Sequence, residues 1–93
     1  MKQIYRDFVR LMSLIKNNPE FSFEIEQEKI TTNLSYSDEE KIWVKRLMIN
    51  GEVFAKSLFN PGVQELVDFC NQFNPDEFSS LINNKIQEIE NHE

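Results

Sequence analysis

The sequence predicts one α+β domain over residues 1–93 that is predominantly α-helical, with four to five helices and one β-hairpin at about residues 20–36. Apolar residues recur at helical spacing through most of the chain, whereas residues 20–36 alternate between apolar and polar side chains. The composition, 40% apolar and 28% charged, is ordinary for a globular domain. The alternative fold is an all-α bundle, in which residues 20–36 are helical too.

The first expected helix covers residues 3–17. Its apolar residues recur every three or four positions, and Asn17-Asn18-Pro19 ends it, because proline disfavours a helical residue before it. The residues that would form its buried stripe are Ile4, Phe8, Leu11, Met12 and Ile15.

Residues 20–36 fit a hairpin better than a helix. Phe21, Phe23 and Ile25 alternate with polar residues, and a turn near residues 27–28 would pair Ile25 with Ile30 and Phe23 with Thr32. That turn contains no Gly, Asn or Asp, and the Asn-Pro-Glu start suits a helix, so the helical alternative stays open.

The clearest local signal covers residues 37–50, for which we predict a central helix. Ser37 and Glu40 have the spacing of a capping box, and Asn50-Gly51 can form a left-handed C-cap. The apolar residues form two triplets around the only tryptophan, Trp43, so we expect this helix to lie at the centre of the core. Further helices are expected at 52–59, 62–73 and 75–91.

No pattern of catalytic, cofactor-binding or metal-ligating residues is present, so we expect no cofactor and no enzymatic activity. Cys70 lies in an apolar stripe with no second Cys and no His nearby in the sequence. His92 is next to the C-terminus, where we expect fraying, and a frayed residue cannot be held in place beside a substrate. Two glycines cannot form a phosphate-binding loop. The carboxylates at 24, 26 and 28 are interpreted as the wet face of the hairpin and not as a cation site.

The formal charge of −6 lies entirely in residues 51–93, where two lysines face eight acidic residues. Such a surface repels nucleic acid and attracts a basic protein. A helix-turn-helix over residues 37–59 is the DNA-binding alternative, with a basic patch formed by Lys41, Lys45 and Arg46. It is less well supported, because its second helix offers no side chain suited to reading bases.

We therefore predict a small acidic protein-binding module, such as an inhibitor, immunity protein or antitoxin-like partner of a basic protein. The second hypothesis is a recognition or leader-type domain, or an accessory subunit, of a peptide-modifying or larger complex. The chain could also associate with a second copy of itself as a homodimer. The single cysteine and the lack of a long apolar run predict a cytoplasmic protein that does not bind a membrane. The high Asn, Ile and Lys usage indicates a bacterial or phage source, and the negative charge predicts no binding to nucleic acid. The candidate partner-binding residues are Glu65, Asp68, Glu88, Glu90, Glu24 and Glu26.

Overall fold

A four-stranded antiparallel sheet and three helices form the fold, and the computed structural model describes residues 2–92. The prediction of a predominantly helical protein with four to five helices is wrong, as is the all-α alternative. The elements in chain order are α1 (Gln3–Asn17), β1 (Ser22–Gln27), β2 (Ile30–Ser37), β3 (Ile42–Ile49), β4 (Glu52–Phe59), α2 (Val63–Cys70) and α3 (Pro75–Glu90).

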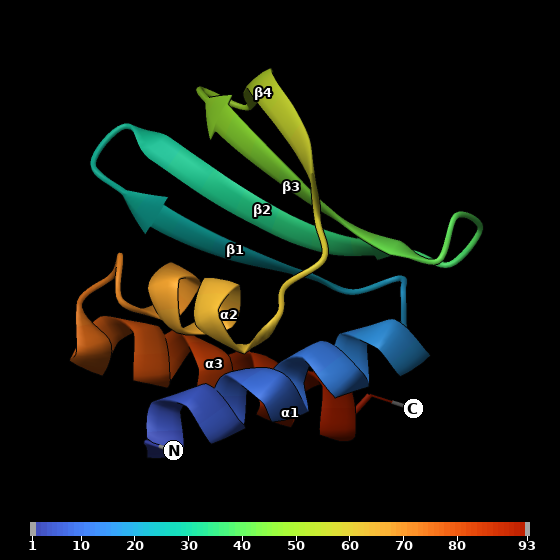
Figure 1. Cartoon of the computed structure of the whole chain (residues 1–93), viewed down its shortest axis with the longest axis vertical. Coiled ribbons are helices and arrows are strands. Elements are labelled where there is room, and N and C mark those ends of the chain that lie inside the picture. Colours follow the sequence, from blue (N-terminus) through green and yellow to red (C-terminus); the bar gives the residue numbers. More distant parts are fainter. Residues whose placement is uncertain (1, 93) are drawn as a thin grey trace.

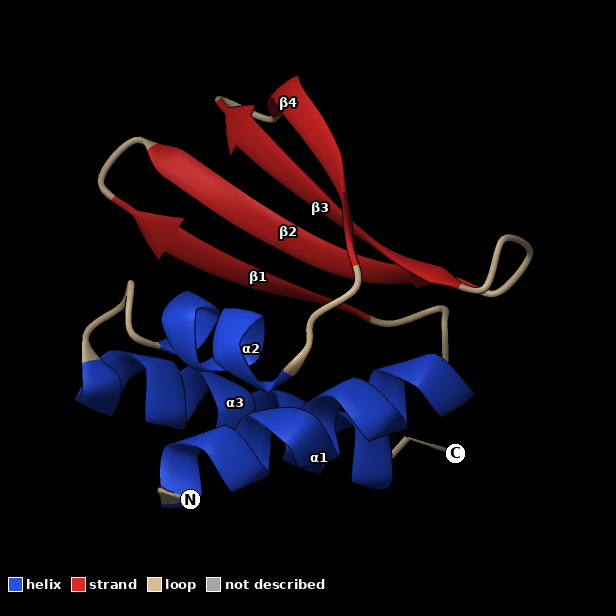
Figure 2. Ribbon diagram, viewed as in Figure 1, coloured by secondary structure: helices blue, strands red, loops and turns tan. Residues whose placement is uncertain are grey.

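The fold has two layers (Figure 1). The strands follow one another in the order β1-β2-β3-β4, so β1 and β4 are the two edges of the sheet. All three helices lie against one face, and the opposite face, called the outer face below, is open (Figure 2). The end of β3 and the start of β4 rise away from the helices. Among residues 2–92, no helix is long and apolar enough to cross a membrane.

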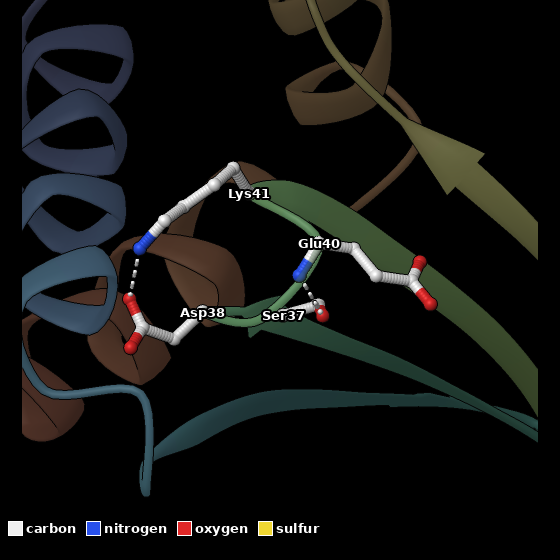
Figure 3. A network of polar contacts seen from close by, with 4 residues as sticks. All are labelled: Ser37, Asp38, Glu40 and Lys41. Atoms are coloured by element: carbon white, nitrogen blue, oxygen red, sulfur yellow. Dashed lines mark hydrogen bonds and ion pairs between the residues drawn. The ribbon is translucent and has the colours of Figure 1, made fainter.

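The predicted central helix at 37–50 is instead the end of β2, a turn and β3. The capping hydrogen bond exists, because the Glu40 amide donates to Ser37 Oγ at 3.1 Å, but it closes only one turn of backbone (Figure 3). Lys41 then adopts a left-handed conformation, with φ 60°, and its Nζ lies 3.0 Å from Asp38 Oδ1. A left-handed residue after a tight turn sends the chain back as the second strand of a hairpin.

Asn50 and Gly51 form the turn between β3 and β4. Their φ angles of 51° and 80° are both positive, which is the geometry of a type I′ hairpin turn. The same two residue types also end helices, so this local signal is compatible with both a helix and a hairpin. The apolar triplets 42–44 and 47–49 supply residues to both faces of the sheet, so they do not mark a broad helical face.

The segment 52–59, predicted as a helix, is the edge strand β4. Leu47 pairs with Ala55 and Met48 pairs with Val53, so Phe54 is the extra residue of a β-bulge. Phe54 and Leu58 are four residues apart, and this spacing looked helical. They contribute little to the core, because their side chains are 53% and 63% exposed.

The hairpin predicted at residues 20–36 is present as β1 and β2, with its pairing shifted. Ile25 pairs with Thr32 and Phe23 with Leu34, so the two-residue turn is Glu28–Lys29. Each partner is two residues away from the predicted one. A shift of two preserves which side chains are buried, so polarity alone could not distinguish the two registers.

The three helices that the structure contains match predicted ones within three residues at each end. They bury their apolar stripes against the inner face of β1, β2 and the first half of β3. Aromatic and aliphatic side chains share the core, and the largest fully buried residues are Phe8, Phe23, Phe78, Leu11, Ile15, Leu34 and Ile82. From β4, only Phe59 packs against this core.

Replacing Asn74 with alanine should destabilise the protein by about 1 kcal/mol. Asn74 Oδ1 accepts hydrogen bonds from the amides of Asp76 and Glu77 at 3.0 and 3.1 Å, so its loss leaves two helix N–H groups without a partner. Urea unfolding followed by circular dichroism measures the change. Asn83→Ala, at an exposed position inside the same helix, is the matched control and should be neutral or slightly stabilising. Equal effects of the two substitutions would contradict the capping role.

Candidate protein-binding groove

A groove runs between the open edge of the sheet and α3. We call it the β1–α3 groove. Its larger part has a volume of about 650 Å³, and a second part of about 300 Å³ adjoins it and shares Glu24 and Leu81. The larger part is lined by Glu24, Glu26, Asp76, Glu77, Ser80 and Leu81, and the smaller one by Ser22, Phe23, Glu24, Leu81, Asn84, Lys85 and Glu88.

The two walls of the groove run antiparallel (Figure 1). Glu26, near the end of β1, faces the start of α3 at Asp76, whereas Ser22, at the beginning of β1, faces Glu88. Twelve helical steps from Asp76 to Glu88 span about 18 Å at ~1.5 Å per residue, and the six residues of β1 span about 20 Å at ~3.3 Å per residue. The walls therefore match in length, and each can accompany a single extended segment of about six residues.

The groove is strongly acidic. Five carboxylates line it, from Glu24, Glu26, Asp76, Glu77 and Glu88, against one ammonium group, that of Lys85. Lys85 already lies 2.7 Å from Glu88. Within residues 2–92, the other four carboxylates form no ion pair, and Glu24 only accepts a hydrogen bond from the Asn33 amide at 3.1 Å. Four negative charges thus face the groove without a cation from the chain.

The groove also offers unpaired backbone N–H and C=O groups of β1. β1 is an outer strand, so one side of its backbone has no neighbouring strand to pair with. An extended segment can add to such an edge through main-chain hydrogen bonds, while its side chains enter the flanking pockets. The groove combines this free edge with a negative lining, an arrangement suited to a basic extended segment.

The structure brings together only part of the predicted partner-binding set. Glu24, Glu26 and Glu88 line the β1–α3 groove. Glu65 and Asp68 lie on α2, beside a different cavity of about 320 Å³ that also contains Lys45. Glu90 binds Arg10 of α1 at 2.6 Å and does not line the groove.

Asp76 and Glu77 belong to the groove but were absent from the predicted set. In the sequence they follow an Asn-Pro helix start, where acidic residues are expected because of the helix dipole. Their nearness to Glu24 and Glu26, some fifty residues earlier, depends on how α3 packs beside β1. No local pattern encodes that contact.

The side chains considered for catalysis occupy other positions. Cys70 is 2% exposed, and burial raises the pKa of its thiol to about 12, so the nucleophilic thiolate is scarce at neutral pH. The His92 ring stands edge-on to Phe21 at 5.1 Å between ring centroids. Within residues 2–92, no three His, Cys, Asp or Glu side chains are grouped so that they could hold a metal ion.

Comparisons of the chain with protein-family models, with characterised proteins and with solved structures found no match.

Proposed function

We propose that this chain is a non-enzymatic protein-binding module whose β1–α3 groove holds a basic, extended segment of another protein. The observation that carries the proposal is the juxtaposition of four carboxylates without a partner cation and a free strand edge. The bound segment adds to β1 as a fifth strand, with lysine or arginine side chains beside Glu24 and Glu26 on one side and Asp76 and Glu77 on the other.

Charge also supports the choice of partner. With a net charge of −6, the protein attracts a basic partner at long range and accelerates encounter at low salt. Two copies of β1 pairing with each other would bring Glu24 and Glu26 close to their own counterparts, and this repulsion disfavours self-association at that edge. The β1 edge thus disfavours pairing with the β1 edge of a second copy and favours pairing with a cationic strand.

An inhibitor, immunity protein or antitoxin that covers a basic surface of its target is the role we propose for this groove. A peptide-recognition domain of a modifying complex would use the same groove, since its length suits a short extended peptide. The two roles differ in what is bound, a folded basic protein or a flexible peptide. Capture from the native host followed by mass spectrometry distinguishes them.

The proposal places the protein in the cytoplasm. Its one cysteine, Cys70, is free and buried, and an unpaired thiol suits a reducing compartment.

Neutralising the α3 wall should weaken binding of a basic strand by about tenfold at low salt, because two exposed ion pairs contribute up to ~1 kcal/mol each. The variant is Asp76→Asn with Glu77→Gln, and the probe is a labelled octapeptide with lysine at alternate positions. Fluorescence anisotropy over a salt series measures the affinity.

The matched control is Glu20→Gln with Glu39→Gln, which removes the same charge at exposed positions away from the groove. A peptide with glutamate in place of lysine tests the sign of the charge. If the groove and control variants lose affinity equally, the groove is not the binding site and only the net charge acts. If the lysine peptide does not bind the unaltered protein, the proposed function is wrong.

A further inference from the structure

The outer face of the sheet carries one continuous row of charged and polar side chains across all four strands. Glu24 pairs with Asn33, Asn33 with Arg46 and Arg46 with Lys56. Residues directly opposite in antiparallel strands share a face, so the four side chains lie side by side. The row is negative at the β1 edge and positive at the β4 edge.

The positive end of this row is unbalanced within the chain. Arg46 and Lys56 face each other across β3 and β4, and like charges at such positions are destabilising. Arg46 donates a hydrogen bond to Ser35 Oγ at 2.9 Å, and within residues 2–92 neither cation forms an ion pair. An anionic group from outside the chain would therefore stabilise the Arg46–Lys56 pair.

Apolar side chains surround the two cations. Val44 and Leu58 form the neighbouring cross-strand pair on one side, and Met48 and Val53 form the pair on the other. Leu58 is 63% exposed and Val53 50%, and Phe54 in the bulge is 53% exposed. Exposed apolar side chains grouped on one surface mark a contact site, and here the partner must also bring a carboxylate.

We propose that the outer face binds the outer face of a second copy of this chain. A two-fold axis parallel to the strands places β1 of each copy over β4 of the other, which is an aligned packing of two sheets. Glu24 of one copy then faces Lys56 of the second copy, and Asn33 faces Arg46 of the second copy. The two-fold axis repeats the Glu24–Lys56 contact, so the negative end of each row neutralises the positive end of the other.

The alternative two-fold arrangement is disfavoured by charge. An axis perpendicular to the strands, in the plane between the sheets, would place Glu24 over its own counterpart and the Arg46–Lys56 pair over itself. Like charges juxtaposed across an interface oppose association. Only the arrangement with antiparallel rows makes the surface self-complementary.

The dimer should be weak. Four strands about 4.8 Å apart and about seven residues long give a flat footprint of roughly 400 Å². Standard stable complexes bury ~800 Å² of accessible surface on each partner, so we expect a dissociation constant in the micromolar range.

Sedimentation equilibrium of three samples tests the proposal, at about 0.15 M salt, where net repulsion between copies is screened. The unaltered protein should approach twice its 11.1 kDa monomer mass at concentrations above about 100 μM. Lys56→Glu and Glu24→Lys should each weaken dimerisation by about tenfold or more, since each places like charges together at two symmetric positions.

Mixing the two variants gives the sharpest result. A Glu24→Lys copy and a Lys56→Glu copy again pair opposite charges at both positions, so the mixture should form a heterodimer that neither variant forms with itself. Glu20→Lys mixed with Lys29→Glu is the control pair at exposed positions outside the row, and each of these proteins should dimerise like the unaltered one. A heterodimer that fails to form in the mixture would overturn the proposed packing.

Other outcomes are equally decisive. A monomer mass for the unaltered protein at about 500 μM would overturn the proposal. If the protein stays monomeric and Lys56→Glu instead abolishes capture of a protein from the native host, the outer face binds that protein and not a second copy.

Glu24 belongs to both surfaces, so the groove and the dimer are separated with variants that leave Glu24 unchanged. Asp76→Asn with Glu77→Gln lies on α3, away from the outer face, and should weaken binding of the lysine peptide with the dimer unchanged. Lys56→Glu should weaken the dimer and leave binding of the lysine peptide unchanged.

Discussion

Replacing Phe8 with alanine should remove about 4 kcal/mol of stability, from the ~3–5 kcal/mol range of buried aromatic truncations. Phe8 is fully buried, and its ring centroid lies 5.4 Å from that of Phe69, 5.5 Å from Phe78 and 6.3 Å from Phe23. One side chain on α1 therefore contacts rings from α2, α3 and β1. Its loss leaves a cavity where all the layers of the fold meet.

Urea unfolding followed by circular dichroism measures this loss. A domain of 93 residues has a total stability of roughly 5–14 kcal/mol, so the variant should retain only about 1–10 kcal/mol. Val63→Ala is the control, because Val63 is 70% exposed and its truncation should change stability by less than about 0.5 kcal/mol. A loss below about 1 kcal/mol for Phe8→Ala would mean that the aromatic cluster does not hold the layers together.

The helices were predictable because each carries its own evidence. In α1, the stripe from Ile4 to Ile15 repeats at helical spacing, and the Asn18-Pro19 pair marks its end within one residue. In α3, the expected start at Pro75 is the observed one, and Asn74 before it is a residue type that commonly caps a helix and does so here. Such signals lie within a few residues of one another, so they do not depend on the rest of the fold.

The strands β3 and β4 were missed because their local signals have two meanings. Ser37 and Glu40 make a capping hydrogen bond in a hairpin turn just as they would at a helix start, and Asn50-Gly51 suits a helix end or a type I′ turn. What decides between them is cross-strand pairing, for example of Val44 with Leu58. Pairing connects residues distant in sequence, and residue spacing within one segment does not report it.

The candidate groove was predictable only in part, for the same reason. The acidity of residues 51–93 is visible in the sequence, and so is the alternation that exposes Glu24 and Glu26. That these two glutamates join Asp76 and Glu77, while Glu65 and Asp68 stand elsewhere, follows from the packing of α3 beside β1. Charge could be counted from the sequence, but its distribution over surfaces required the fold.

Trp43→Ala should cost about 3–5 kcal/mol, although Trp43 lies on a strand and not on the predicted central helix. The side chain is 8% exposed, and its ring meets that of Tyr36 edge-on at 5.1 Å between centroids. Its partners are Tyr36 on β2 and Phe59 on β4, and it lines a cavity with residues of α1. Trp43 therefore joins the helical layer to the base of the β3–β4 hairpin, whose far end rises away from the helices.

Trp43→Phe is the conservative control. It keeps an aromatic ring against Tyr36 and should lose less than half as much stability as the alanine variant. Circular dichroism is the suitable readout, because replacing the only tryptophan also removes the tryptophan fluorescence signal. If Trp43→Ala has almost no effect, backbone pairing alone holds β3 and β4 in place. The loss should instead be large, because Phe59 is the only β4 side chain packed against the core, and Trp43 is its cross-strand partner.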